Sequence, residues 1–515
     1  MGASNERLRA VDDWLRAKAP AGAQLRIDSR AVAPGDVFIA LPGRHVNGLQ
    51  YLDQALARGA AAVVVDEDSW SARVGGTELR VPLLPVAALN SMLGSIAADF
   101  YGEASAKLRT IGITGTNGKT SSCQWIAQLL TAAGQRCATI GTLGFGFPQA
   151  LRHEGTDLTT PDAVSLHRLA RTALDEGAKA LAIEVSSIGL DQGRVEGICF
   201  GVALFTNLSR DHLDYHPDMQ AYAAAKRKLF DCSTLTDAVL NLDDAFGLEV
   251  ARELSARGLR VTGVSTQRDG GTGFALACRL RAQGIEHHAQ GMRFGVVCER
   301  GGAEQTVFVE VSLIGDFNVT NLLGVLGVAL ACEISLDQAA TLAAALRAPP
   351  GRLQRVATES QTGGPVAIVD YAHTPDAIAK ALEALRPLAR ARGGRLWIVF
   401  GAGGDRDRGK RPVMGAAAAS GAEDIVLTSD NPRSENAELI IDQVASGIPR
   451  GVSFRRNVDR AQAIQEALRQ ADVADVVLIA GKGHEEYQET AGRRLPFSDY
   501  TVARNVLLAR EERSS

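Results

Sequence analysis

The stretch GITGTNGKTSS, residues 112–122, contains the residue types that bind the phosphates of a nucleotide. It follows an apolar run at residues 108–113 that predicts a strand, and it precedes a helical pattern at residues 120–134. A P-loop occurs in this order of strand, glycine-rich loop and helix. The usual P-loop pattern would begin with a glycine at the position of Ile113, so the spacing here differs from that pattern.

Lys119 and Thr120 stand at the start of the predicted helix, where the positive helix end attracts anions. Backbone N–H groups of residues 115–118 could surround phosphates, with Lys119 neutralising the β and γ oxygens and Thr120 reaching Mg²⁺. The alternative is an ordinary strand–helix turn, but glycine alone does not explain G-K-T at a helix start. A switch GTPase or motor ATPase would have an aspartate on a second strand, whereas the strand predicted at residues 179–187 offers Glu184.

Length, charge and cysteine usage limit the class of protein. A chain of 515 residues is expected to form about three domains. Its net charge of −4 predicts no general affinity for nucleic acid, and without an apolar run of about 20 residues we expect no membrane insertion. The first 17 residues are charged and are not read as a signal peptide. Seven scattered cysteines without a CxxC pair indicate neither a disulfide framework nor a zinc site, so we expect a cytoplasmic protein.

Short runs rich in Val and Ile alternate with longer amphipathic stretches, which predicts an α/β fold with parallel sheets and crossover helices. Ligands bind at the carboxyl ends of such strands, so the polar residues that end the runs are candidate site residues. Domain joints are expected near residues 101–110 and 346–356. The predicted strands lie at residues 60–67, 108–115, 179–187, 201–208, 366–372, 395–404, 424–431 and 476–483.

Several motifs occur together in a fixed order along the chain. They are GITGTNGKTSS (112–122), TTPD (159–162), EVSS (184–187), TNLSRDHLDYH (206–216), AYAAAKRKLF (221–230), DYAHTPDA (370–377), GAGGDRDRGKRPVMG (401–415), DNPRSE (430–435) and GKGHEEYQ (481–488). From about residue 25 to 490 the chain therefore resembles the Mur ligases of peptidoglycan synthesis. In that family the variant P-loop spelling is normal.

The resemblance implies a monomer with three domains, and it implies an enzymatic activity. A UDP-sugar-binding domain is expected at residues 1–104, a central ATP-binding domain with a P-loop ATPase-like parallel sheet at 105–346, and a Rossmann-like amino-acid-binding domain at 347–515. The implied reaction joins meso-diaminopimelate to UDP-N-acetylmuramoyl-L-alanyl-D-glutamate at the expense of ATP. Because oxide is a poor leaving group, the substrate carboxylate must first become an acyl phosphate, which the amine then attacks. Both steps gather negative charge, so Mg²⁺ and cations are needed.

The resemblance also implies the magnesium ligands, which are Thr120, Glu184, His212 and Lys226. In Mur ligases the lysine matching Lys226 is carbamylated to N6-carboxylysine, which turns a cation into an oxygen donor. Without the resemblance, Lys226 would be read as a solvated lysine on a helix and His212 as a hydrogen-bonded loop histidine. Lys228 lies about 200° away on the same predicted helix and cannot share the role.

The residues matching the ATP-binding positions of the family are Gly115, Thr116, Asn117, Gly118, Lys119, Thr120, Asn318, Asp370 and His373, with Asn321 near the adenine. An asparagine such as Asn318 is otherwise most often a helix cap. The positions matching UDP-sugar-peptide contacts are Ser29, His45, Val46, Asn47, Thr159, Thr160, Ser186, Gln192 and Arg194. Many relatives have a histidine where this chain has Ile188, so that contact is absent here.

A diamino diacid is a zwitterion, and its recognition requires an arginine fork for carboxylate and an acid for ammonium. The residues that match the diaminopimelate-binding positions are Arg406, Asp430, Asn431, Pro432, Arg433, Gly481 and Glu485. The alternative interpretation of the DNPR sequence is a surface turn, because Asn-Pro favours turns.

Two other functions stay open. A sister ligase, either the lysine-adding Mur ligase or a folylpolyglutamate synthetase, would share the ATP chemistry; Arg433 and the segment at residues 28–30 argue against both. A nucleotide-regulated binding module would hydrolyse ATP only to change shape. That class would not need Glu184, His212 and Lys226 together.

Overall fold

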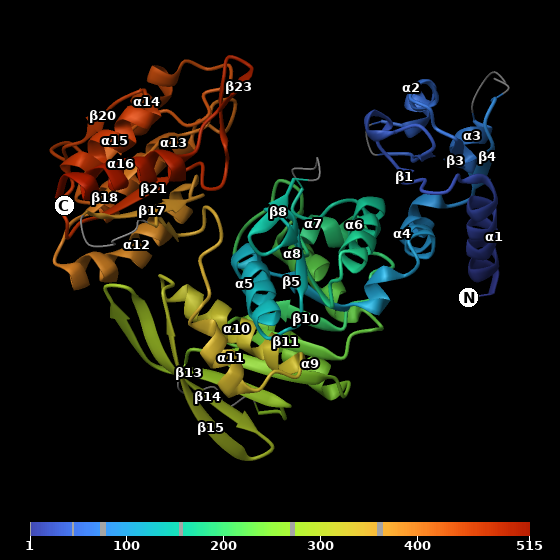
Figure 1. The fold of residues 1–515 in the computed structure, drawn as a ribbon, viewed down its shortest axis with the longest axis horizontal. Helices are drawn as coiled ribbons and strands as arrows, with labels where there is room; N and C mark the ends of the chain where they lie inside the picture. Colours follow the sequence, from blue (N-terminus) through green and yellow to red (C-terminus); the bar gives the residue numbers. More distant parts are fainter. Residues whose placement is uncertain are drawn as a thin grey trace. The chain divides into compact units, whose positions relative to one another are not determined.

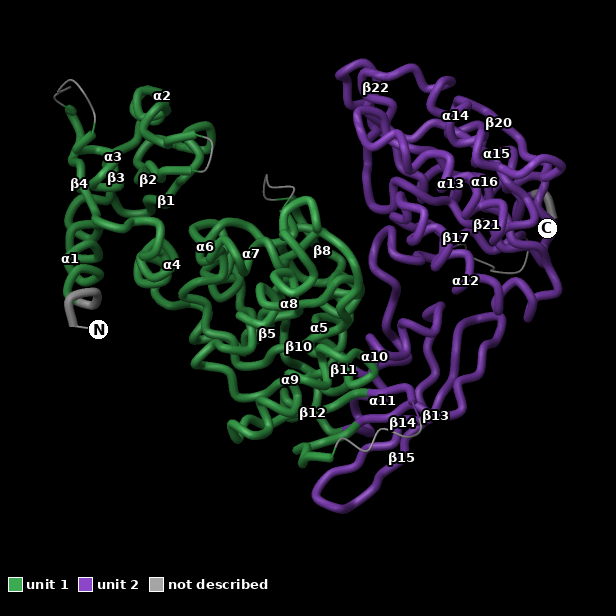
Figure 2. Tube along the Cα trace, turned by 180° about the vertical axis from the view of Figure 1, so that it is seen from behind, with its two compact units in different colours: residues 1–264, 270–279, 324–335 green, residues 265–269, 280–323, 336–515 purple. Residues whose placement is uncertain are grey.

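The computed structural model describes residues 2–43, 46–72, 79–153, 158–267, 273–357 and 364–514. The chain forms two compact units (Figure 2). Unit 1 contains residues 1–264, 270–279 and 324–335, and unit 2 contains residues 265–269, 280–323 and 336–515. Figure 1 labels many of the helices and strands of both units.

Unit 1 begins with a four-stranded parallel sheet in the order β1–β2–β3–β4. The strands β2 and β3 are buried along their whole length, as expected of parallel strands covered on both faces. The elements of this part are α1 (Gly2–Lys18), β1 (Leu25–Arg26), β2 (Val37–Ala40), α2 (Leu52–Ala57), β3 (Ala62–Asp66), α3 (Glu67–Ser71), β4 (Leu83–Val86) and α4 (Leu89–Phe100).

A larger sheet follows in unit 1, with the strand order β12–β11–β10–β5–β9–β6–β7–β8. From β12 to β6 the neighbours are parallel, while β7 and β8 are antiparallel. The elements are β5 (Arg109–Thr114), α5 (Lys119–Ala132), β6 (Cys137–Gly141), β7 (Gly144–Phe147), β8 (Ala150–Arg152), α6 (Ala163–Asp175), β9 (Ala180–Glu184), α7 (Ser187–Asp191), β10 (Val202–Phe205), α8 (Met219–Arg227), β11 (Asp237–Asn241), α9 (Ala245–Ala256) and β12 (Arg260–Ser265).

The register of this sheet decides which side chains meet at its carboxyl edge. Ile113 on β5 lies opposite Glu184 on β9, and Thr114 lies opposite Phe205 on β10. The glycine-rich loop after β5 therefore emerges beside Glu184 on one side and beside the residues after Phe205 on the other.

Unit 2 contains an antiparallel hairpin, β14–β15, and a second, mostly parallel sheet in the order β16–β17–β21–β18–β19–β20. A two-stranded hairpin, β22–β23, lies near its carboxyl edge. The remaining elements of the chain are β13 (Cys278–His288), β14 (Gly291–Arg300), β15 (Ala303–Val311), α10 (Phe317–Ala331), α11 (Leu336–Ala343), β16 (Gln354–Arg355), β17 (Val366–Asp370), α12 (Pro375–Arg392), β18 (Leu396–Phe400), α13 (Lys410–Gly421), β19 (Asp424–Leu427), α14 (Ala437–Ala445), β20 (Arg455–Arg456), α15 (Arg460–Gln470), β21 (Val476–Ala480), β22 (Tyr487–Thr490), β23 (Arg493–Pro496) and α16 (Asp499–Ser514).

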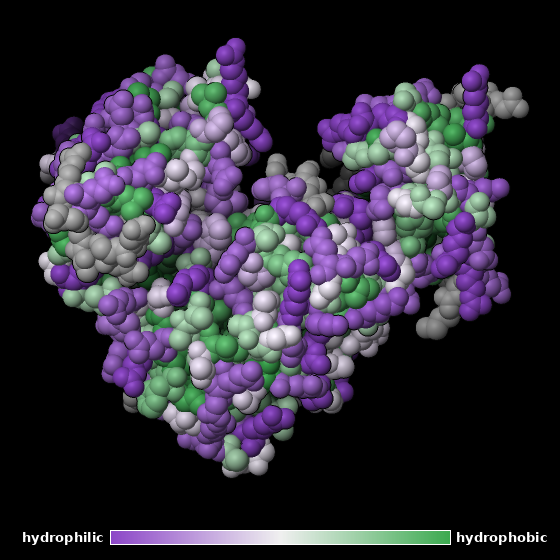
Figure 3. Space-filling view, viewed as in Figure 1, coloured by the Kyte–Doolittle hydropathy of each residue, from purple (hydrophilic) through white to green (hydrophobic). Residues whose placement is uncertain are grey.

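The predicted α/β class with a central parallel sheet is confirmed, and each predicted apolar run contains a strand. All seven cysteines are free thiols. Among the described residues no helix is long and apolar enough to cross a membrane. Hydrophilic residues predominate on the face drawn in Figure 3, with hydrophobic ones interspersed.

Gly94 provides a test of packing in unit 1. A Cβ at this position on α4 would lie 2.3 Å from the Glu196 carbonyl oxygen. Alanine favours a helix by about 1 kcal/mol over glycine, but overpacking against backbone costs about 1–3 kcal/mol. Gly94→Ala should therefore lower the urea midpoint of unfolding. Gly201→Ala is the control, since its nearest neighbouring atom is 3.9 Å away. A higher midpoint for Gly94→Ala would contradict this packing.

Candidate functional site

The glycine-rich loop joins the end of β5 to the start of α5. Gly118 immediately precedes α5 with φ of 82°, in the left-handed region that favours glycine. Gly115 has φ of 149°, and a Cβ there would lie 1.9 Å from the Thr206 hydroxyl oxygen. Ile113 is fully buried within β5, where the usual pattern would have a glycine. The loop therefore needs glycine at positions 115 and 118 and an apolar strand residue at 113.

The segment that follows β10 holds this loop from one side. The Thr116 N–H donates to the Asn207 carbonyl at 2.7 Å, and the Asn117 N–H donates to the Asn207 side chain at 3.1 Å. The Thr206 hydroxyl donates to the Asn117 carbonyl at 2.6 Å. Thr206 and Asn207 were not predicted as site residues, although both stand at the carboxyl end of a predicted strand.

Lys119 folds back over the loop. Its Nζ donates to the carbonyl oxygens of Gly115 and Thr116, both at 2.9 Å. The ammonium thus lies on the loop itself, where it can exchange these carbonyl partners for the oxygens of a bound phosphate.

Glu184 is a buried carboxylate at the end of β9, with 1% of its surface exposed. One oxygen accepts hydrogen bonds from the hydroxyls of Thr120 (2.8 Å) and Thr142 (3.1 Å), and the other accepts from the Thr142 N–H at 3.0 Å. A Cβ on Gly141 would lie 2.1 Å from the latter oxygen. Thr142 was not predicted as a site residue, because its hydrogen-bond partner Glu184 lies 42 residues away in the sequence.

The residues predicted to contact the muramoyl peptide form one network next to Glu184. Thr142 and Thr159 hydroxyls lie 3.2 Å apart, and the Thr160 hydroxyl donates to the Glu184 carbonyl at 2.8 Å. Thr160 also lies 3.1 Å from the Ser186 hydroxyl. The Arg194 guanidinium donates to the Thr160 carbonyl at 2.8 Å.

Arg194 also donates to the Gln192 side-chain oxygen at 2.6 Å, so these predicted residues lie together.

In the amino-terminal part of the chain, the Ser29 hydroxyl donates to Gln54 at 2.6 Å and the Asn47 side chain accepts from the Leu49 N–H at 3.0 Å. Val46 is exposed, and His45 lies outside the described residues.

Lys226 is buried, with 1% of its surface exposed, and is not the solvated lysine of the alternative interpretation. Its Nζ donates to the Gly115 carbonyl at 2.7 Å and lies 4.4 Å from the centre of the Tyr222 ring. Burial, together with the nearby Lys119 ammonium, lowers the pKa of Lys226 to about 6. This shift favours the neutral amine of Lys226, the form that reacts with CO₂. Lys228 instead pairs with Asp191 at 3.1 Å.

His212 has φ of 53°, in the left-handed region, and its ring centre lies 6.1 Å from that of Tyr222. The Tyr222 hydroxyl lies 3.0 Å from that of Thr116, which connects this pair to the glycine-rich loop.

No three His, Cys, Asp or Glu side chains in the described part of the chain are grouped so that they could hold a metal ion. A carbamylated Lys226 would supply a hard oxygen ligand of the kind that Mg²⁺ prefers, as the carboxylate of Glu184 does, so the chemistry of these two donors fits Mg²⁺.

In unit 2, the predicted ATP-side residues have internal partners. The Asp370 carboxylate accepts from the N–H groups of Leu353 (2.7 Å) and Ala372 (2.8 Å), and burial raises its pKa. The His373 ring lies 2.8 Å from the Tyr371 carbonyl. The Asn318 side chain donates to the Ile314 carbonyl at 2.7 Å, and Asn321 donates to Asn318 at 3.1 Å.

The residues predicted to bind the amino acid lie around the carboxyl ends of β18, β19 and β21. Arg433 has φ of 50°, and its Nη1 donates to the Gly404 carbonyl at 2.7 Å. A Cβ on Gly403 would lie 3.1 Å from Nη1 of Arg433 and 3.8 Å from Cγ of Arg406, so the two arginines flank this glycine.

The next loop brings further predicted residues into the same group. A Cβ on Gly481 would lie 2.4 Å from an Asp430 carboxylate oxygen, which places the two loops against each other. Nδ2 of Asn431 donates to Glu485 at 2.8 Å. Lys482, which was not predicted, is fully buried and donates to both Asn431 (2.9 Å) and Glu485 (3.0 Å). A lysine two residues after the end of a buried strand was the available signal.

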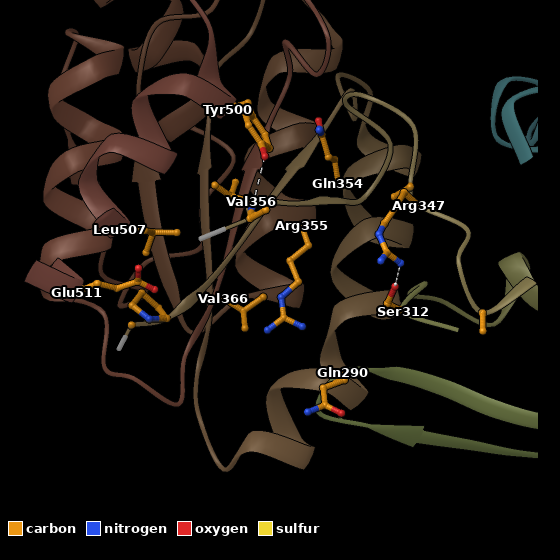
Figure 4. A pocket seen from close by; sticks show the side chains of 15 residues that line it. Gln290, Ser312, Arg347, Gln354, Arg355, Val356, Val366, Tyr500, Leu507 and Glu511 are labelled. Carbon is orange, nitrogen blue, oxygen red and sulfur yellow. Dashed lines mark hydrogen bonds between the residues drawn. The ribbon is translucent and has the colours of Figure 1, made fainter. Parts of the chain in front are cut away.

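A cavity of about 530 Å³ in unit 2 lies apart from these residues (Figure 4). Its polar lining includes Arg347, Gln354, Arg355 and Tyr500, and none of the predicted site residues lines it. Arg347 donates to the Ser312 hydroxyl at 3.4 Å.

The chain matches three family models, described as the Mur ligase family catalytic domain over residues 23–101, the Mur ligase middle domain over 113–329, and the Mur ligase glutamate ligase domain over 351–483. It is 46% identical to a protein of Ralstonia nicotianae named UDP-N-acetylmuramoyl-L-alanyl-D-glutamate–2,6-diaminopimelate ligase, over 98% of this chain and 96% of that protein. A protein of the same name from Coxiella burnetii is 45% identical, over 94% and 95%. A solved structure of a ligase with that name has a TM-score of 0.66, is 36% identical and covers 95% of each chain.

Lys119→Ala should lower ATP-dependent phosphate release by roughly 100- to 1000-fold, because a charge contact at a transferring phosphoryl group is worth about 3–4 kcal/mol. The fold should persist, since glycines and Asn207 build the loop. Phosphate release and the melting temperature are the measurements. Lys380→Ala, which removes an exposed lysine paired with Asp376, is the control. Near-normal turnover of Lys119→Ala would contradict the prediction that the glycine-rich loop binds the phosphates.

Proposed function

Because the chain belongs to the Mur ligase family, we propose that it is an ATP-dependent amide ligase that joins meso-diaminopimelate to UDP-N-acetylmuramoyl-L-alanyl-D-glutamate in peptidoglycan precursor synthesis. The observation that carries this proposal is the match, along nearly the whole chain, to ligases named for that reaction. The same region contains every residue proposed for the site.

The first step is activation of the D-glutamate carboxylate. Its oxygen attacks the γ-phosphorus of ATP, the bond to the β–γ bridging oxygen breaks, and ADP leaves. The resulting acyl phosphate has phosphate as its leaving group in place of oxide. Lys119 is proposed to offset the charge on the transferring phosphoryl group, and its position over the loop carbonyls supports this role.

The residues proposed to hold Mg²⁺ are Thr120, Glu184, His212 and carbamylated Lys226. When bound, Mg²⁺ offsets negative charge on the phosphate oxygens. Carbamylation requires a neutral amine: the Lys226 nitrogen attacks the carbon of CO₂, a C–N bond forms, and a proton leaves to solvent. The burial of Lys226 beside Lys119 supports this modification, because both keep the amine uncharged.

The second step is attack of the amino-acid amine on the acyl phosphate, with release of phosphate. Arg433 is proposed to bind the distal carboxylate of diaminopimelate, and Glu485 to contribute to the same site. Thr160, Ser186 and Arg194 are proposed to hold the peptide whose carboxylate is activated, a role supported by their hydrogen bonds around Glu184.

The domain boundaries stay part of this proposal, with UDP-sugar binding at residues 1–104, ATP binding at 105–346 and amino-acid binding at 347–515. ATP and Mg²⁺ are the proposed co-substrate and cofactor, and a monomer in the cytoplasm is the proposed state.

Lys226→Ala should lose at least about 100-fold in ligation rate, because an oxygen ligand of Mg²⁺ is removed. Lys226→Glu should recover part of that rate by restoring a carboxylate of similar reach, whereas Lys228→Ala should keep near wild-type turnover. The modification itself is tested by electron density at the Lys226 amine in a crystal grown with bicarbonate. An unmodified ammonium there in an active, Mg·nucleotide-bound complex would end the carbamate proposal.

The proposed function is tested by phosphate release with each of ATP, UDP-N-acetylmuramoyl-L-alanyl-D-glutamate and the amino acid omitted in turn. Release should require all three, and meso-diaminopimelate should exceed L-lysine by roughly 100-fold or more in kcat/KM, because lysine leaves Arg433 without a carboxylate. Arg433→Ala should lose most diaminopimelate activity. Release without the amino acid would favour a nucleotide-regulated binding module, and equal use of lysine would favour the lysine-adding ligase.

A further inference from the structure

We propose that Glu489, on the hairpin β22–β23, is a specificity-determining residue that accepts the distal ammonium of the incoming diamino acid. Arg433 beside it would bind the distal carboxylate, so that the two side chains together recognise one zwitterion. This inference rests on the proposed function and adds to its amino-acid site a residue that neither the family motifs nor the comparisons assign.

Main-chain hydrogen bonds attach the hairpin to the DNPR segment. The Arg433 N–H donates to the Glu489 carbonyl at 3.0 Å, and the Ala491 N–H donates to the Arg433 carbonyl at 2.7 Å. The Glu489 N–H donates to the Asn431 side-chain oxygen at 2.9 Å. Glu489 is therefore held next to Arg433 by backbone contacts that do not involve its carboxylate.

The two charged side chains form a loose pair. Nε of Arg433 lies 3.8 Å from Oε2 of Glu489, longer than the roughly 2.7–2.9 Å of a charge-assisted hydrogen bond. Their side chains are 24% and 23% exposed, so both are partly desolvated yet accessible. Among the described residues, neither Nη2 of Arg433 nor the Glu489 carboxylate has a hydrogen-bond partner. Each group can therefore accept a ligand without losing a bond.

Glu485, the other acid of this site, already has hydrogen-bond donors within the protein. Its Oε2 already accepts from the buried Lys482 ammonium and from Asn431. That carboxylate is neutralised within the protein. In the part of the chain that the structure describes, the Glu489 carboxylate accepts no such hydrogen bond, and its other cationic neighbour, Arg494, lies 3.8 Å away with a side chain 59% exposed.

The charges at Glu489 and Arg433 make recognition cooperative. A ligand carboxylate bound to Arg433 would replace Glu489 as the partner of that arginine. The Glu489 carboxylate would then be free to bind an ammonium group of the same ligand. A ligand with only the carboxylate meets repulsion from Glu489, and a ligand with only the ammonium meets repulsion from Arg433. A carbon that carries both groups, as at the distal end of diaminopimelate, satisfies both side chains.

The experiment compares meso-diaminopimelate with L-2-aminopimelate, which keeps the distal carboxylate but lacks the distal amine. We expect Glu489→Gln to lower kcat/KM for diaminopimelate at least tenfold, mainly through KM, and to leave unchanged or raise that for L-2-aminopimelate. Glutamine keeps the backbone contact to Asn431. Glu486→Gln, which changes an exposed neighbouring acid, is the matched control and should alter neither substrate more than twofold.

Several outcomes would overturn the assignment. Equal changes for both substrates would make Glu489 only a counterion of Arg433, and no change would remove it from the site. Arg494→Ala is a second variant with an intact Glu489; it should lower KM for diaminopimelate, and a higher KM would count against the proposal. A wild-type protein that does not use diaminopimelate would instead overturn the proposed function, which is a separate result.

Discussion

Parallel pairing of β5 with β9 and β10 is the constraint on which the unit 1 site depends. It sets Ile113 opposite Glu184 and Thr114 opposite Phe205, so that three carboxyl ends share one edge. The glycine-rich loop then has a buried carboxylate on one side and Asn207 on the other. A shift of one residue in the pairing of β9 with β5 would turn Glu184 to the opposite face of the sheet.

Burial gives the charged groups of this edge their chemical character. Lys119 and Lys226 both donate to the Gly115 carbonyl, yet only Lys226 is almost completely withdrawn from solvent. Burial lowers the pKa of Lys226 and so favours its neutral amine. Two lysines that donate to one carbonyl thus differ in charge preference because they differ in depth.

The fold was largely predictable from the sequence, and the site only in part. Buried parallel strands are continuous apolar runs, which is why β5, β9, β10 and β21 could be located without a structure. Glu184 and Lys119 follow such runs and were therefore visible. Thr142, Asn207 and Lys482 were missed because their role comes from partners distant in sequence, such as the pair of Thr142 with Glu184. A periodic pattern cannot reveal such pairs.

The hairpin β22–β23 separates the contacts that hold it in place from the side-chain charge that it presents beside Arg433. The hairpin is attached to residues 431–433 through its own peptide groups, which every amino acid except proline would retain at position 489, whereas the Glu489 carboxylate has only loose ion pairs with Arg433 and Arg494. A substitution of the Glu489 side chain should therefore change the charge beside Arg433 with little effect on the scaffold. The charge beside Arg433 can therefore change independently of the backbone contacts that hold the hairpin in place.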